Sequence, residues 1–191
     1  MNKSMTQEII IAGFGGQGVL SMGQIIAYAA MEGKKEVSWM PSYGPEMRGG
    51  TANCTVIVSD SRISSPIITK FDTAIVLNQP SIEKFENAVK PGGILIYEKS
   101  TILHPPARKD IEVLAIPGLE EAQKLKSKQV ANMVLLGAYL ELCPIVKLEH
   151  VISALHNVLP PHRQHLIPLN EQALERGRDL AIEAKTKMAA R

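Results

Sequence analysis

The feature that most constrains the fold of this chain is a glycine-rich turn that follows three consecutive isoleucines at residues 9–11. The isoleucines suit a buried strand, because β-branched side chains pack well on a pleated sheet. Gly13, Gly15 and Gly18 have the G-x-G-x-x-G spacing with which a strand turns directly into a helix. Gly16 removes one more side chain, so main-chain N–H groups and the positive end of the helix face the same space. The sequence therefore predicts an anion site there, most simply for a phosphate.

Apolar periodicity and breaker residues predict a Rossmann-like α/β fold with three layers, a mostly parallel sheet and helices on both faces. A helix is expected over residues 19–30, followed by a strand at 35–40 that is parallel to the first in a β-α-β unit. Alternating β-branched residues at 51–58 predict an antiparallel hairpin with residues 62–66. Further strands are expected at 72–77, 94–97 and 111–116, and helices at 131–142, 148–159 and 170–188.

Length and charge bound the domain organisation and the class of partner. The 191 residues suit a single domain, 1–191, since one core of this size buries most of its apolar surface. Lys and Arg number 21 against 19 Asp and Glu, and this small excess argues against nucleic acid as the main partner. The chain has no uncharged apolar run of about 18 residues and no apolar signal core at its start. We therefore expect a cytoplasmic protein without a membrane partner.

Cysteine and histidine usage argues against a metal on this chain. Cys54 and Cys143 are the only cysteines, and each stands alone in an apolar neighbourhood. An iron–sulfur cluster usually takes four thiolates, so no cluster is expected here. The five histidines also lack the spacing and the acidic neighbours of a metal site. Both cysteines are expected to be buried, structural thiols.

The turn by itself is typical of a dinucleotide site, but the second half of that pattern is missing. A NAD site usually has Asp or Glu about 20 residues beyond the glycines, at the end of the second strand, to bind the ribose hydroxyls. Here that place holds Ser38, Trp39 and Met40, whereas Glu36 lies at the start of the strand. The sequence therefore disfavours NAD.

A loop rich in proline and glycine follows the predicted second strand, at an edge where doubly wound sheets bind ligands. Arg48, beside Gly49 and Gly50, suits a phosphate or a carboxylate, because a guanidinium can bind such groups bidentately. Tyr43 and Glu46 are carried by the same loop. Docking of a partner explains the loop equally well.

A second strand-to-helix junction is predicted at Asn78 and Gln79, at the same edge of the sheet as the glycine turn. Ser81 is the expected cap of the helix that follows, and residues 90–93 are expected to end that helix. Asn78 and Gln79 are therefore candidates for contact with a substrate channel or a partner.

Four motifs, taken in order, resemble those of one protein family. They are Gly13-Phe-Gly-Gly-Gln-Gly18, Ser42-Tyr-Gly-Pro-Glu-Met-Arg-Gly-Gly50, Ile63-Ser-Ser-Pro66 and Asn78-Gln-Pro80. Over residues 9–140 the chain resembles the gamma subunit, or gamma domain, of thiamine-diphosphate-dependent 2-oxoacid:ferredoxin oxidoreductases. This family includes the pyruvate, 2-oxoglutarate and ketoisovalerate enzymes.

The resemblance implies a role in an assembly rather than a complete enzyme. In this family the whole enzyme oxidatively decarboxylates a 2-oxoacid to an acyl-CoA and passes electrons through iron–sulfur clusters to ferredoxin. The gamma chain is implied to handle CoA and to pack against alpha and beta subunits, and in some complexes a ferredoxin-like delta subunit. Thiamine diphosphate, magnesium and iron–sulfur clusters are expected on these partners, because this sequence has no cysteine array and no Gly-Asp-Gly stretch with a downstream Asn. A 2-oxoglutarate or branched-chain substrate is favoured, and the isolated chain is expected to be inactive, with no catalytic residue of its own.

The resemblance and the residues together favour a CoA site built from two segments. CoA fits the incomplete dinucleotide pattern, because it carries a pyrophosphate but needs no acid on a free ribose diol. The expected cofactor-binding residues are Gly13, Phe14, Gly15, Gly16, Gln17, Gly18, Val19, Arg48, Gly49, Gly50 and Thr51. Tyr43, Glu46, Asn78 and Gln79 are expected along the substrate channel or at a partner contact. The alternatives are a scaffold subunit whose glycine turn is empty and, less favoured, an independent NAD(P)-binding reductase.

Overall fold

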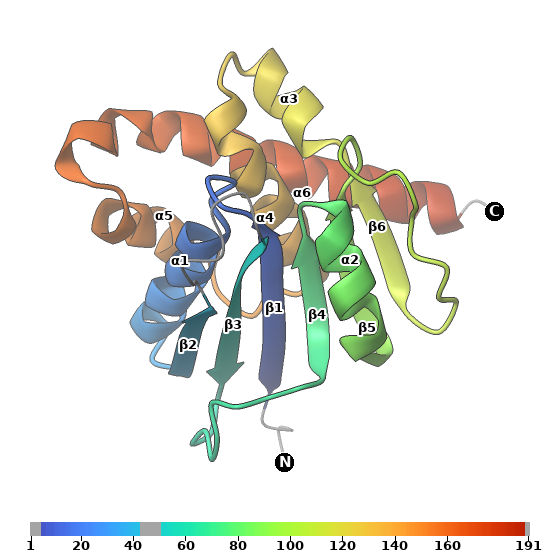
Figure 1. Cartoon of the computed structure of the whole chain (residues 1–191). Helices are drawn as coiled ribbons and strands as arrows, with labels where there is room; N and C mark the ends of the chain where they lie inside the picture. Colours follow the sequence, from blue (N-terminus) through green and yellow to red (C-terminus); the bar gives the residue numbers. More distant parts are fainter. Residues whose placement is uncertain (1–4, 43–50, 190–191) are drawn as a thin grey trace.

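The structure is a computed structural model that describes residues 5–42 and 51–189, and Figure 1 shows its mixed β-sheet flanked by helices. Within these residues six strands form one sheet in the order β2-β3-β1-β4-β5-β6. The strands are β1 (Thr6–Phe14), β2 (Glu36–Ser42), β3 (Thr51–Ser59), β4 (Phe71–Val76), β5 (Val89–Glu98) and β6 (Glu112–Ile116). β1, β4, β5 and β6 are parallel neighbours, whereas β3 runs antiparallel to both β1 and β2.

Helices lie on both faces of the sheet, as the sequence predicts. The α-helices are α1 (Val19–Glu32), α2 (Gln79–Phe85), α3 (Gly118–Lys124), α4 (Ala131–Leu142), α5 (Leu148–Val158) and α6 (Ile167–Ala189). Short 3-10 helices are η2 (Glu86–Ala88), η3 (Lys128–Val130) and η4 (Pro161–Leu166). None of the described helices combines the length and the apolar content that a membrane span requires.

Strand β1 connects the two halves of the core because both of its faces are buried. Ile9 and Ile11 pack on the side of α1, α4, α5 and α6, whereas Ile10 and Ala12 pack on the side of α2. Successive side chains of a strand point to opposite faces, so a run of isoleucines fills both layers at once. The three-layer α/β architecture predicted from the sequence is confirmed.

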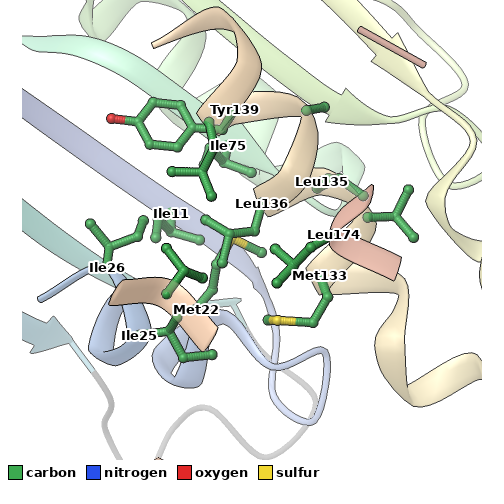
Figure 2. Close-up of a cluster of buried hydrophobic side chains, with 14 of the residues drawn as sticks. Ile11, Met22, Ile25, Ile26, Ile75, Met133, Leu135, Leu136, Tyr139 and Leu174 are labelled. Carbon is green, nitrogen blue, oxygen red and sulfur yellow. The ribbon is translucent and has the colours of Figure 1, made fainter. Parts of the chain in front are cut away.

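Helix α4 is the buried centre of the larger helical layer. Its first ten residues are all buried, which agrees with its apolar sequence on nearly every face. Figure 2 shows Leu136 and Tyr139 of α4 near Ile11 and Ile75 of the sheet, with Leu174 of α6 close to the α4 side chains. The position of α4 therefore depends on contacts with both the sheet and α6.

The predicted β-α-β unit is wrong in one respect, because its two strands are not neighbours. β2 runs in the same direction as β1, but β3 lies between them and is antiparallel to both. The burial of the two strands agrees with this order. β3 is buried at most positions and takes the inner place, whereas β2 is half-buried or exposed along its length and forms the edge.

The predicted hairpin between residues 51–58 and 62–66 is also wrong. The first segment is strand β3, but residues 62–66 form no strand and are mostly exposed. Both edges of β3 are already paired, one with β1 and one with β2. No edge of β3 is left for a third partner, so the following residues form a loop instead.

Two local predictions around α2 need correction. The cap of this helix is Asn78, whose Oδ1 accepts a hydrogen bond from the Ser81 backbone N–H at 3.0 Å, and not Ser81 itself. Residues 90–93 do not end a helix, because α2 and the short η2 have already ended at Ala88. They form the irregular start of β5, where Gly92 has a φ of 76°.

The Cys54 thiol is expected to resist alkylation in the folded protein. Burial raises the pKa of Cys54 to about 12, and burial likewise raises the pKa of Cys143. Since the thiolate is the reactive form, Cys54 should react about a thousandfold more slowly at pH 8 than an ordinary cysteine. Timed iodoacetamide labelling with peptide mass spectrometry measures this rate, and the same protein in guanidinium chloride is the control. Native labelling of Cys54 within tenfold of the unfolded rate would contradict the prediction.

Candidate functional site

The glycine turn lies where the two halves of the fold diverge. It follows β1, and the neighbouring parallel strand β4 ends beside it at the same edge of the sheet (Figure 1). The helices that follow these strands leave to opposite faces, α1 to one and α2 to the other. In α/β sheets such a point forms a crevice at the carboxyl ends of the strands, where ligands usually bind.

The backbone of the turn leaves the N-terminus of α1 open. Gly16 and Gly18 have φ angles of 91° and 76°, a region that favours glycine. Gly18 is the N-cap of α1, no side chain of the described residues caps this helix, and its first turn contains no acidic residue. The first backbone N–H groups of a helix have no acceptor within it. Together with the helix dipole, they make this end suitable for an anion.

Some residues of the predicted ligand segment instead build the turn. Oε1 of Gln17 accepts a hydrogen bond from the Phe14 N–H at 2.6 Å, and its Nε2 donates to the Leu77 carbonyl at 3.2 Å. Gly13 is buried against the same side chain, since a Cβ on it would lie 2.7 Å from Oε1 of Gln17. Gly15 and Gly16, by contrast, are exposed. Gln17 and the buried Gly13 therefore fix the turn on its inner side, whereas Gly15 and Gly16 are exposed to solvent.

A residue far along the chain fixes the other end of the turn. Nδ2 of Asn132, at the start of α4, donates to the Gly18 carbonyl at 3.2 Å. A Cβ on Gly18 would overlap the Asn132 amide, so any larger residue there would force this side chain to move and break the hydrogen bond. The Asn132 side chain therefore joins the turn to the start of α4.

Three cavities adjoin the turn, and all of them include Gly16 in their walls. The first, of about 300 Å³, lies over the exposed side and is lined by Phe14, Gly15, Gly16, Gly18, Val19, Leu20, Ser21, Ala52 and Arg163. The second, of about 370 Å³, lies among α1, α4, α5 and η4. The third, of about 190 Å³, includes Glu98 and Lys128. Gly16 is therefore part of the lining of all three of these cavities.

Two cations at these cavities are not apparent from the sequence. Arg163 of η4 lines the first and second cavities, and Lys128 of η3 lines the third. Both side chains are exposed, and neither has an ion pair or a side-chain hydrogen bond among the described residues. Only the folding of the C-terminal helices over the turn brings them there. An unpaired guanidinium beside an open helix N-terminus is well suited to a phosphate.

The described residues bring only part of the second predicted segment to the site. Thr51 pairs with Phe14 at the end of β1, so it lies beside the turn. Ser42 pairs with Asn53 at the same end of the sheet. The other predicted residues of this segment, Tyr43, Glu46, Arg48, Gly49 and Gly50, lie outside the described residues.

Asn78 and Gln79 lie at the neighbouring strand end, where they organise local structure. Asn78 is buried and caps α2. Oε1 of Gln79 accepts hydrogen bonds from the N–H groups of Leu103 and His104, both at 3.0 Å, and thereby holds the loop after β5. Contact of Asn78 or Gln79 with a substrate channel or a partner stays a prediction.

The geometry adds a second argument against a NAD site. In the usual arrangement the second strand lies next to the first, but here β3 separates them. Glu36 pairs with Ser59, which in turn pairs with Thr6 at the opposite end of β1 from the turn. No other grouping suggests a metal, since the described residues contain no cluster of three His, Cys, Asp or Glu side chains that could hold one.

Comparison with known sequences identifies the family. The pattern described as pyruvate ferredoxin/flavodoxin oxidoreductase matches residues 8–180. The chain belongs to this family. Ketoisovalerate oxidoreductase subunit VorA of Methanothermobacter thermautotrophicus is 38% identical over 176 residues, which is 92% of this chain and 36% of VorA.

Solved structures agree with the family assignment. The gamma subunit of a keto/oxoacid ferredoxin oxidoreductase from Geobacter sulfurreducens matches with a TM-score of 0.80 and 30% identity, over 93% of this chain and 99% of that one. The 2-oxoglutarate:ferredoxin oxidoreductase from Magnetococcus marinus, with 2-oxoglutarate, coenzyme A and succinyl-CoA bound, matches with a TM-score of 0.84 and 27% identity. That match covers 93% of this chain and 31% of the other. The chain thus spans about a third of VorA and of the Magnetococcus chain, and its predicted resemblance to gamma subunits is confirmed.

Proposed function

We propose that this gamma chain handles CoA for a thiamine-diphosphate-dependent 2-oxoacid:ferredoxin oxidoreductase. The observation that carries the proposal is that the N-terminus of α1 and the guanidinium of Arg163, which has no ion pair among the described residues, face one cavity. CoA presents a diphosphate and a further phosphate on its ribose. Backbone N–H groups and a bidentate guanidinium are the groups that proteins use for such anions. The CoA and succinyl-CoA in the Magnetococcus relative support the same ligand.

The remaining chemistry is assigned to partner chains. Thiamine diphosphate and magnesium on the alpha and beta subunits supply the decarboxylation, and iron–sulfur clusters there or on a delta subunit pass electrons to ferredoxin. The two cysteines of this chain, Cys54 and Cys143, are both buried, which suits structural thiols rather than cluster ligands. This chain binds CoA at the glycine turn and presents the thiol to the partner that holds the acyl group.

The proposed substrate is 2-oxoglutarate or a branched-chain 2-oxoacid. The names of two similar proteins, a ketoisovalerate oxidoreductase subunit and a 2-oxoglutarate:ferredoxin oxidoreductase, support this pair of substrates. The choice between them rests with the subunits that bind thiamine diphosphate. Purifying the chain under mild conditions and assaying the complex with both acids tests the partners and the substrate together.

A scaffold without a ligand is the second candidate. It is favoured by the internal hydrogen bonds of the turn, in which Gln17 occupies the Phe14 N–H and Asn132 the Gly18 carbonyl. Packing alone could then explain glycine at these positions. In that case the complex would bind CoA equally well without this chain.

Arg163→Ala is expected to weaken CoA binding to the assembled complex by about 10- to 100-fold. Hydrogen bonds to a charged group contribute about 1.5–3 kcal/mol, and the guanidinium has no other partner among the described residues. Isothermal titration of CoA measures the change. Arg62→Ala is the matched control, because Arg62 is also exposed but follows β3 at the opposite end of the sheet.

Equal CoA affinity in the Arg163→Ala and Arg62→Ala complexes would remove Arg163 from the site. Undiminished CoA affinity in a complex that lacks this chain would favour the scaffold. Saturable NADH binding by the chain, with no CoA binding, would support the reductase instead.

A further inference from the structure

The second cavity has a lining that a phosphate site does not need. Its volume is about 370 Å³, within the range of small-molecule sites. Its lining includes apolar side chains from several helices, and Figure 2 shows two of them, Ile25 of α1 and Met133 of α4, in the core cluster. Leu155 and Leu159 close the cavity from the side of α5. Such walls suit a flat, weakly polar ring.

Two nearly buried amides supply the polar part of this lining. Asn132 and Asn170 are each only 7% exposed, and both line the cavity. Nδ2 of Asn132 donates to the Gly18 carbonyl at 3.2 Å, and Nδ2 of Asn170 donates to the Leu166 carbonyl at 2.7 Å. These bonds orient both amides and leave each Oδ1 as an acceptor. Within the described residues neither Oδ1 accepts a side-chain or backbone hydrogen bond, so each is free to accept one from a molecule in the cavity.

A ligand that fits this cavity has a ring with an N–H donor and a phosphate next to that ring. Its walls share Gly16, Gly18, Ser21 and Arg163 with the first cavity, so a group inside it adjoins the anion site directly. Adenine has an apolar face and an exocyclic amino group, and in CoA it is joined through ribose to the diphosphate. A pantetheine arm fits less well, because its thiol would be enclosed by α1, α4 and α5 instead of reaching a partner.

We propose that the second cavity binds the adenine of CoA and that its 6-amino group donates to Oδ1 of Asn170. This inference rests on the proposed function, because it concerns the same ligand. It also fixes the direction of CoA on the chain. The phosphates lie over Gly16, and the pantetheine arm leaves through the first cavity past Phe14 and Ala52.

The experiment compares CoA with an analogue that has hydrogen in place of the 6-amino group, and measures both dissociation constants for the assembled complex. The unaltered protein is expected to bind the analogue about 10- to 100-fold more weakly, since a site built to accept a donor is left unsatisfied. Asn170→Leu should bind CoA as weakly as the analogue and no longer distinguish the two. Asn157→Leu, on the exposed face of α5, is the control and should distinguish them fully.

The outcomes separate this inference from the proposed function. Equal, tight binding of CoA and the analogue would overturn the adenine assignment and leave CoA handling intact. Binding of neither would overturn both. The comparison of ligands uses the unaltered protein, so the result holds even where the Asn170→Leu chain does not fold.

Discussion

Gly177→Ala is expected to lower the free energy of unfolding by about 3 kcal/mol or more, one of the largest effects of a single added methyl group in this chain. Gly177 lies on α6 where that helix crosses α4. A Cβ there would overlap the Val134 carbonyl oxygen and lie 2.8 Å from its carbonyl carbon and 2.9 Å from the Ala138 nitrogen. All three atoms are backbone, so no side-chain rotation can relieve the overlap. The two helices would have to separate.

The higher helix propensity of alanine is too small to offset this loss of stability. Alanine is favoured over glycine in a helix interior by about 1 kcal/mol. Separating α6 from α4 also loosens the packing between Leu174 and the α4 residues shown in Figure 2. Gly137 of α4 is in the same situation, because a Cβ on it would overlap the Leu174 backbone of α6. Both helices therefore need glycine where they cross.

Denaturant unfolding monitored by circular dichroism measures the loss. Gly33→Ala is the control, because Gly33 has a φ of −73° and a Cβ there would lie 3.3 Å from its nearest neighbour, the Ala30 carbonyl. Its stability should stay within about 1 kcal/mol of the unaltered protein. A Gly177→Ala chain as stable as Gly33→Ala would mean that α4 and α6 do not cross this closely.

The sequence predicts the parts of the fold that local physics determines. The isoleucines of β1, the glycine turn and the apolar α4 follow from periodicity and backbone freedom, and all are found in the structure. Strand order does not follow from such patterns. β3 lies between β1 and β2 and is more buried than β2. Which strand takes the inner position depends on how each packs against distant segments, and local sequence patterns do not contain this information.

Some residues of the candidate site are likewise predictable from the sequence, and others are not. The spacing points to Gly13, Gly15 and Gly18, with Gly16 as an extra glycine between them, and the structure places Gly16 in the wall of the three cavities described above. Arg163 and Asn170 carry no local signal, because each becomes part of the site only when η4 and α6 fold over the turn. A basic residue after a double proline is common in surface loops. Residues of this kind are found by three-dimensional proximity and by their lack of another partner.

Gly16→Val is expected to reduce CoA affinity of the assembled complex by more than about 100-fold while the chain still folds. Apart from its chain neighbours, no atom of the described residues lies within 4 Å of a Cβ built on Gly16, so the side chain would extend toward the cavities that Gly16 lines. A β-branched side chain at a φ of 91° also strains the backbone, at a cost of about 1–3 kcal/mol in stability. The affinity loss should exceed what this strain alone explains, because the valine would occupy the position proposed for the phosphates.

Gly92→Val separates the two effects. Gly92 also has a positive φ, of 76°, and open space around its Cβ position. It lies near the start of β5, whereas the turn lies at the opposite ends of the parallel strands. Both variants should lose similar stability in thermal unfolding, and only Gly16→Val should lose CoA binding in titration. Retained CoA affinity in Gly16→Val, at equal loss of stability, would show that the phosphates do not lie over the turn. Loss of CoA binding in both variants would instead attribute the effect to strain, because Gly92 is too far from the turn to touch a ligand there.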